Sequence, residues 1–412
     1  MRRLPNAIRL YILRRRPHIA AVLSFLAVLG VAAACTGKWF FDANGYNTYA
    51  LQADAWLHGR LDLGQDYPWL ELAIYEGRYY VSFPPFPSYV LLPFALFMGT
   101  ATPDGLICLM FSVLGLWTAV RIALDTGADE RTAVFLALFL FLGTGYLFIA
   151  LTPGVWFMAQ VMCFNLSLLS LYCALKGRGF LALLWWSCAV GCRPMVIFFL
   201  PLLIMLLWRA HREAHPRDTA LTVLRRRACW ILPPLVIGGS YMALNYLRFH
   251  DILEFGHNYL PEFTRAEYGQ FSLTYLMGNL RTLFRLPTRA ADGRLVIQPF
   301  DGAFFPLIDP MCLPILYTLI RALFKKRPAD RRLSALTLLS ALIYLLVLCS
   351  HRTLGGWQFG NRYLKDIMPW LFTGYLLLRE KGGRVGWTLI PLFLLGLSVS
   401  LTGTVITYNY WY

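Results

Sequence analysis

Charged residues are scarce in this 412-residue sequence: they make up 15% of it, whereas 58% of the residues are hydrophobic. The mean hydropathy of +0.54 is far above that of soluble globular proteins, so the composition excludes an ordinary soluble enzyme. Apolar runs of about 18 residues or more recur along the chain, and this is the length that a helix needs to cross a bilayer. The sequence therefore predicts an all-α polytopic membrane protein, with residues 1–412 forming a single integral membrane domain.

Metal-binding and redox motifs are missing as well. The nine cysteines lie in or beside apolar segments, and their spacing matches no zinc or redox motif. We interpret them as small apolar helix residues. No cleavable signal peptide is evident, so the first apolar run is expected to be a retained span. There is also no convincing internal repeat of the kind found in many transporters.

Acidic residues are fewer than basic ones, 22 against 38, which leaves a net charge of +16. Such a charge is compatible with nucleic-acid binding, but its distribution follows membrane topology. If the N-terminus is cytoplasmic and residues 86–99 do not cross, the inner segments carry 25 Lys and Arg and the outer ones 13. If residues 86–99 did cross, the inner count would fall to 16 against 22 outside, contrary to the positive-inside rule. We therefore predict a cytoplasmic N-terminus, an outer C-terminus and no nucleic-acid partner.

This topology has about eleven transmembrane helices. Residues 86–99 are short for a span and contain Pro87 and Pro93, which favours an interfacial or re-entrant helix. Two long segments, 37–103 and 248–301, lie on the outer side and are expected to carry the chemistry. The predicted spans are 17–36, 104–124, 133–151, 155–175, 179–192, 194–208, 229–247, 302–323, 333–350, 366–379 and 386–406.

The first outer segment contains Asp42, just past the first span. A helical stripe follows it, formed by Tyr46, Tyr49, Ala50, Ala53 and Leu57, which predicts a helix lying along the membrane surface. Two simpler interpretations stay open at this point. In the first interpretation, Asp42 or Asn44 caps that helix. In the second, Asp54 and His58, which are four residues apart, only pair with each other on its polar face.

Several other polar residues stand out near the expected membrane surface. Glu71, Arg78 and Tyr80 precede the Pro-rich start of the short helix, where the alternative is an aromatic interface belt. Arg362 lies at the start of a span, where a guanidinium is costly without a partner, and a phosphate is a fitting one. Arg193 lies at a turn within about 30 apolar residues, where an arginine faces a polar cavity more often than lipid. The alternative for Arg362 is that it extends to lipid headgroups. A loop with Arg281, Arg285, Arg289 and Arg294 either guards the entrance of an anionic substrate or is plain surface charge.

The order of these motifs resembles bacterial members of the glycosyltransferase C superfamily, over nearly the whole chain. The matching segments are the Asp42 helix ending in "LHGRLDL", then "GRYYVSFPPFPSYVLLPF", "RP", "NYLRF…EFG" and "GWQFGNRY". The resemblance implies a polytopic enzyme of the bacterial plasma (inner) membrane. It also implies two interfacial helices in the first extracytoplasmic loop and a sugar donor linked to polyprenyl phosphate. The sequence departs from the family at Asp42-Ala43-Asn44, where many relatives have an acidic pair.

The resemblance also implies residue roles for an inverting transfer on the extracytoplasmic face. Asp42 would be the general base, with Glu71 and Asp54 as alternates. Arg193 and Arg362 would hold the lipid phosphate, with Arg78 as a third candidate. We expect Asp42, Glu71, Arg193 and Arg362 to converge on one cavity. The candidates for contacts with the sugar or the lipid are Tyr80, Trp357 and Gln358.

The other participants follow less directly. The acceptor is a lipid, a glycan or a protein, and no motif demands a metal or another cofactor, although some superfamily members use a divalent ion. Two alternative functions stay open. One is a transporter or flippase for a lipid-linked anion, which should place charges near the bilayer centre. The other is a non-catalytic glycosyltransferase-like subunit that has lost its acidic residues.

Overall fold

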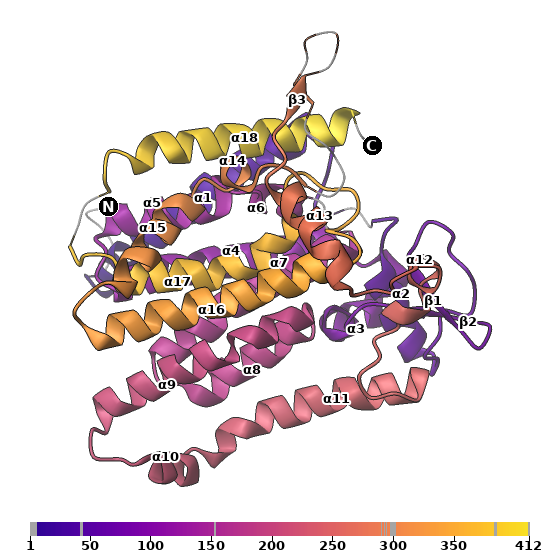
Figure 1. The fold of residues 1–412 in the computed structure, drawn as a ribbon, viewed down its shortest axis with the longest axis horizontal. Coiled ribbons are helices and arrows are strands. Elements are labelled where there is room, and N and C mark those ends of the chain that lie inside the picture. Colours follow the sequence, from indigo (N-terminus) through magenta and orange to yellow (C-terminus); the bar gives the residue numbers. More distant parts are fainter. Residues whose placement is uncertain are drawn as a thin grey trace.

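The computed structural model describes residues 6–41, 44–151, 154–289, 291, 293, 295–296, 302–382 and 385–410. Within this part the chain is mainly helical, and its two small sheets are antiparallel pairs of short strands, β1 with β2 and β3 with β4. Figure 1 shows the long helices side by side in one bundle. The helices of the first half are α1 (Asn6–Thr36), α2 (Thr48–Leu57), α3 (Phe86–Met98), η1 (Gly99–Ala101), α4 (Asp104–Asp125), α5 (Glu130–Leu142), α6 (Tyr146–Leu151), α7 (Val155–Leu175), α8 (Gly179–Val190), η2 (Pro194–Phe199) and α9 (Leu200–Ala214).

The second half has the same character and ends with a long helix. Its helices are α10 (Ala220–Arg226), η3 (Ala228–Ile231), α11 (Leu232–Phe249), η4 (His257–Tyr259), α12 (Pro261–Thr264), α13 (Leu273–Leu283), α14 (Phe305–Ile308), α15 (Cys312–Leu323), α16 (Pro328–Ser350), η5 (Arg362–Ile367), α17 (Met368–Leu378) and α18 (Leu389–Tyr410). The strands are β1 (Leu72–Tyr75), β2 (Arg78–Val81), β3 (Thr288–Arg289) and β4 (Leu295–Val296).

Seven helical segments of the described chain are long and apolar enough to cross a membrane. They begin at Arg15, Asp104, Val155, Pro194, Ala228, Pro328 and Leu389, and all seven overlap predicted spans. The multi-pass membrane character is therefore confirmed, whereas the number of eleven is not.

The other four predicted spans are shorter helices. Residues 133–151 are divided between α5 and α6, and α8, α15 and α17 have 12, 12 and 11 residues. A helix of 12 residues is about 18 Å long, which is less than the thickness of a hydrocarbon core.

Helix α7 lies at the centre of the bundle, because 83% of its apolar window is buried inside the protein. It packs against α4, α8, α9 and α17. Most of its side chains are apolar or small, and two buried amides, Gln160 and Asn165, are hydrogen-bonded to neighbouring segments. Such a helix, apolar on every face, is typical of the core of a membrane bundle.

The first long loop folds into α2, the β1–β2 hairpin and α3, and these gather at one end of the bundle together with α12 (Figure 1). In α2, Tyr49, Ala50 and Ala53 of the predicted stripe are buried, whereas Leu57 is exposed. The Ser88 hydroxyl donates a hydrogen bond to Gln52 Oε1 (2.8 Å), which joins α3 to α2. Both helices exist as expected, and their position along a membrane surface stays a prediction.

The start of α2 shows whether Asn44 caps this helix. The residue that precedes the helix is Asn47, and its side chain makes no capping hydrogen bond. Asn44 Oδ1 instead accepts a hydrogen bond from the Tyr46 N–H (2.9 Å), before the helix begins, so capping by Asn44 was wrong. Asp42 lies outside the described residues.

Two buried ion pairs connect the short helix η5 to distant segments. Lys365 pairs with Asp309, and both side chains are fully buried. Asp309 also accepts a hydrogen bond from the Gly145 N–H (3.0 Å). Asp366 pairs with Arg193 (2.8 Å), which lies between α8 and η2. Because buried charges are tolerated only when paired, these two contacts determine how η5 sits in the bundle.

Removal of one partner of the Lys365–Asp309 pair is expected to destabilise the protein strongly. Lys365→Met leaves a buried carboxylate unpaired, and such changes cost about 3–5 kcal/mol. The double variant Lys365→Met/Asp309→Leu removes both charges and should recover most of that loss. Unfolding of the purified proteins in detergent measures both, with Lys381→Met as an exposed control. Equal stability of the single and double variants would contradict the coupling.

Candidate active site

A cavity of about 360 Å³ opens at the end of the bundle where the long loops gather. We call it the main cavity. The first long loop, the turn before α7, the α8–η2 connection, the loop after α11 and the segment after α16 all contribute to it. Glu71, Arg193 and Arg362 all line it. Three of the four residues expected to converge are thus brought together, and the fourth, Asp42, lies outside the described residues.

The basic side of the main cavity consists of two arginines that share one aromatic ring. The guanidinium carbon of Arg193 lies 4.3 Å from the ring centre of Tyr363, and that of Arg362 lies 4.6 Å from it. Arginine stacks readily on aromatic faces. Tyr363 therefore holds both guanidinium groups at the cavity wall.

Arg362 is only 3% exposed, yet within the described chain no carboxylate lies within ion-pair distance of it. Its Nη1 donates to Gln160 Oε1 and its Nη2 to the Tyr363 hydroxyl, both at a long 3.4 Å, and its buried Nε has no partner. Rings of Trp156 and Phe157 also face it. A guanidinium that is buried without a counterion is costly, and an anion in the cavity would compensate it.

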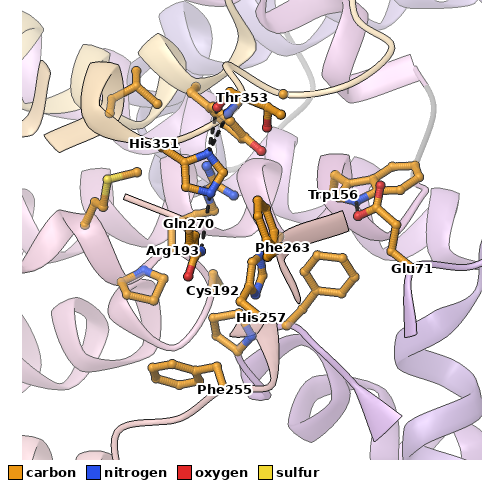
Figure 2. Close-up of a pocket in the computed structure, with 18 of the residues that line it drawn as sticks. Glu71, Trp156, Cys192, Arg193, Phe255, His257, Phe263, Gln270, His351 and Thr353 are labelled. Carbon is orange, nitrogen blue, oxygen red and sulfur yellow. Dashed lines mark hydrogen bonds between the residues drawn. The ribbon is translucent and has the colours of Figure 1, made fainter. Parts of the chain in front are cut away.

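The acidic side of the main cavity is centred on Glu71, which follows the first loop's turn and precedes β1. Its Oε2 accepts a hydrogen bond from Trp156 Nε1 (2.9 Å), and Figure 2 shows the two side chains facing each other. Glu71 is an exposed residue, although protein atoms crowd its carboxylate. This desolvation raises the pKa of Glu71, while the hydrogen bond from Trp156 and the charge of Arg362 act in the opposite direction.

Two histidines of the main cavity were not identified from the sequence. Burial lowers the pKa of His257 to about 4, so it is neutral near pH 7. His351 Nε2 is 3.3 Å from Gln270 Nε2, and its Nδ1 is 2.7 Å from the Thr353 carbonyl oxygen (Figure 2). His257 lies in the predicted outer segment 248–301, and His351 directly follows the predicted span 333–350. These positions were the only available signal.

The loop after α11 supplies much of the rest of the wall. It brings in two further carboxylates, and one of them, Glu254, accepts hydrogen bonds from the Gly256 N–H and from Asn258 Nδ2 (both 2.5 Å). Burial raises the pKa of the other, Glu262, while the charge of Arg352 acts against this. Further lining residues from this loop are Leu253, Phe255, Phe263 and Phe271.

Three candidates from the first loop lie elsewhere. Asp54 is 3.6 Å from His58, whose side chain is exposed, so this alternative pairing is present. Arg78 is exposed in the hairpin, 3.7 Å from Asp62. Tyr80 is buried against Phe249. None of these three lines the main cavity.

Two other predicted site residues lie close to Arg362 in the sequence but do not line the main cavity. Gln358 is fully buried and accepts a hydrogen bond from the Arg362 N–H (2.9 Å), while its amide donates to backbone carbonyls. Trp357 packs among the rings of Phe148, Phe157 and Tyr408. Their positions indicate that they shape the loop that carries Arg362.

Within the described residues, no three His, Cys, Asp or Glu side chains are grouped closely enough to hold a metal ion. Glu71, Glu254 and Glu262 line one cavity but do not form such a group.

The arrangement of these helices is that of the glycosyltransferase C fold, so the resemblance noted in the sequence is confirmed for the fold. One solved structure that this chain resembles is ArnT from Cupriavidus metallidurans bound to undecaprenyl phosphate. It has a TM-score of 0.50 and 13% identity, over 95% of this chain and 75% of that one. ArnT in the apo state has a TM-score of 0.49 and 14% identity, over 94% and 75% of the two chains.

A third similar structure is the archaeal oligosaccharyltransferase AglB from Archaeoglobus fulgidus, in complex with an inhibitory peptide and a dolichol-phosphate. Its TM-score is 0.44 and its identity 14%, over 94% of this chain and 56% of that one. No family model matches the sequence. No curated protein sequence matches it significantly either. At such low identity the similarity concerns the fold, and the activity has to be argued from the site.

Proposed function

We propose that this protein is a membrane glycosyltransferase that moves a sugar from a polyprenyl-phosphate carrier to an acceptor hydroxyl. The observation that carries the proposal is Arg362, a buried guanidinium without a carboxylate partner in the described chain, in the same cavity as Glu71. A phosphate at Arg362 and a carboxylate across the cavity are the two groups that such a transfer needs. The ligand in the similar ArnT structure, undecaprenyl phosphate, supports the same class of donor.

The transfer is an inverting substitution. The acceptor hydroxyl attacks the anomeric carbon of the sugar, and the bond from that carbon to the phosphate oxygen breaks. The proton of the hydroxyl passes to a carboxylate, and the bonding electrons leave with the polyprenyl phosphate. Such general-base assistance contributes about 10²–10⁴-fold. Arg362, with Arg193 beside it, stabilises the charge on the departing phosphate.

Among the described carboxylates we assign the base to Glu71, because it lines the same cavity as both arginines and lies within electrostatic reach of Arg362. Asp42 is an equally specific candidate from the sequence and lies outside the described residues. Asp54 is the weakest of the three, since it pairs with His58 away from the main cavity. Activity measurements on Glu71→Gln and Asp42→Asn separate the first two of these carboxylates.

We further propose the topology inferred from the charges: eleven spans, a cytoplasmic N-terminus and a main cavity on the extracytoplasmic side of the bacterial inner membrane. The excess of basic residues in the loops opposite the main cavity supports this orientation. In this arrangement α2 and α3 lie at the outer interface. Cysteine labelling of positions in α3 and α10 from either side of the membrane tests it.

The direct test is a transfer assay with the purified protein. Polyprenyl-phosphate-linked sugars are offered together with a set of lipid, glycan and peptide acceptors. We expect release of polyprenyl phosphate and a glycosylated product with inverted anomeric configuration. Binding of the donor followed by its movement across a vesicle membrane, without transfer, would instead support the flippase alternative. Failure to bind polyprenyl phosphate at all would contradict both.

The hydrogen bond from Trp156 gives a pH prediction. It stabilises the charged form of Glu71, so Trp156→Phe is expected to raise the pKa of Glu71 further. A general base must be deprotonated, so activity falls as the pH drops through its pKa. The acidic limb of the pH–rate profile should therefore move to higher pH in the variant. Trp208→Phe, at an exposed position of α9, is the control and should leave the acidic limb of the profile unchanged.

A further inference from the structure

The two arginines of the main cavity differ in charge compensation. Arg193 donates from Nε to Asp366 Oδ2 (2.8 Å) and is thereby paired with a carboxylate. Arg362, on the same Tyr363 ring, has no carboxylate within ion-pair distance in the described chain. The three side chains Arg193, Arg362 and Asp366 together carry one net positive charge. We call them the arginine clamp.

Asp366 is held firmly in this role. Its side chain is fully buried, and its Oδ2 also accepts a hydrogen bond from the Tyr344 hydroxyl (2.9 Å). That hydroxyl is in turn 2.9 Å from the Tyr363 carbonyl oxygen. Because Nε of Arg193 faces Asp366, the two terminal nitrogens of Arg193 are left for the main cavity. The neutralisation of Arg193 is thus a fixed part of the fold and does not depend on solvent.

Three carboxyl groups that line the main cavity also affect which ligand charge the site tolerates. Glu71, Glu254 and Glu262 line the cavity, and among the described lining residues Arg193 and Arg362 are the arginines. A ligand with one negative charge is matched by Arg362. A second negative charge would enter a partly desolvated space that already holds carboxylates, which is unfavourable.

We propose that Asp366 is a positioning residue that sets the charge specificity of the site. By neutralising Arg193 it limits the arginine clamp to a single unpaired positive charge, which selects a carrier linked through one phosphate over one linked through a diphosphate. A sugar joined to a lipid through one phosphate is a phosphodiester with one negative charge, whereas the diphosphate-linked carrier has two. This inference rests on the proposed function, since it concerns the phosphate of the same donor.

The size of the effect follows from the charges. One unit charge at about 5–8 Å in a partly buried site corresponds to about 2–3 kcal/mol at an effective dielectric constant of about 20. Release of Arg193 from Asp366 should therefore change the relative affinity for the two carriers by about ten- to a hundredfold. A purely structural role of Asp366 would weaken both ligands alike and leave their ratio unchanged.

The experiment measures dissociation constants at pH 8 for two probes, the methyl ester of polyprenyl phosphate and the terminal methyl ester of polyprenyl diphosphate, which carry one and two negative charges. The wild-type protein should bind the singly charged methyl ester at least about tenfold more tightly. Asp366→Asn should shift the ratio toward the diphosphate by about ten- to a hundredfold. Tyr344→Phe, which removes a hydrogen bond to Asp366 but no charge, should keep the wild-type ratio.

The double variant Arg193→Gln/Asp366→Asn restores the net charge of the arginine clamp and should also keep the wild-type preference. Wild-type protein that prefers the diphosphate overturns the proposal even if Asp366→Asn does not fold. An unchanged ratio in a folded Asp366→Asn variant overturns it too, while leaving the proposed function intact. Absence of binding of either probe to the wild-type protein overturns the proposed function and this inference together.

Discussion

Glu71→Gln is expected to lower the rate of sugar transfer by about 10²–10⁴-fold, the usual contribution of a general base. The substitution keeps the shape of the side chain and its capacity to accept a hydrogen bond from Trp156 Nε1. It removes the group that takes the proton of the acceptor hydroxyl. Donor binding should change little, because in this proposal the phosphate is held by Arg362 and Arg193 and not by Glu71.

The measurement is the rate constant at saturating donor and acceptor, as a function of pH. The wild-type rate constant should fall as the pH drops through the pKa of Glu71. That pKa should lie above the ordinary value for glutamate, because desolvation raises it. Glu267→Gln, on the loop after α11 but outside the main cavity, is the matched control and should behave like the wild type. Full activity of Glu71→Gln, combined with loss in Asp42→Asn, would assign the base to Asp42.

Arg362→Gln is expected to lower the transfer rate by about 10²–10³-fold, comparable to removal of one donor that stabilises a developing anion. The loss should appear both in the rate constant and in donor affinity, since the same guanidinium binds the phosphate and stabilises it as it departs. Arg362→Lys keeps the charge but loses the planar contacts with Tyr363 and Trp156, so it should recover only part of the activity.

Stability separates a role in binding from a role in folding. Arg362 is buried without a described carboxylate partner, so its replacement by a neutral side chain should not lower the free energy of unfolding strongly. Arg78→Gln is the control for a general charge effect, because Arg78 is exposed and lies outside the main cavity. A large loss of stability together with unaltered donor affinity would show that Arg362 acts through the fold.

The sequence predicted the membrane-spanning character and three cavity residues because both depend on local chemistry. Long apolar runs can satisfy their backbone groups in lipid only as helices, so the pattern alone implies the helical bundle. Arg193 and Arg362 stood out since a guanidinium beside apolar spans needs a partner, and Glu71 since carboxylates are scarce near such spans. The count of eleven spans depends on charge counting and is not confirmed by the lengths of α5, α6, α8, α15 and α17.

Only the tertiary structure decided how the charges are paired. Asp366 lies next to Lys365 in the chain, yet one binds Arg193 and the other Asp309, 173 and 56 residues away in the sequence. Neighbouring residues of a short helix point in different directions, and packing selects their partners. In the same way Tyr80, Trp357 and Gln358 entered the packed interior, whereas His257, His351 and Trp156 reached the main cavity. Aromatic and polar side chains at a membrane edge look alike in a sequence, and only the packed fold determines which of them face an enclosed space.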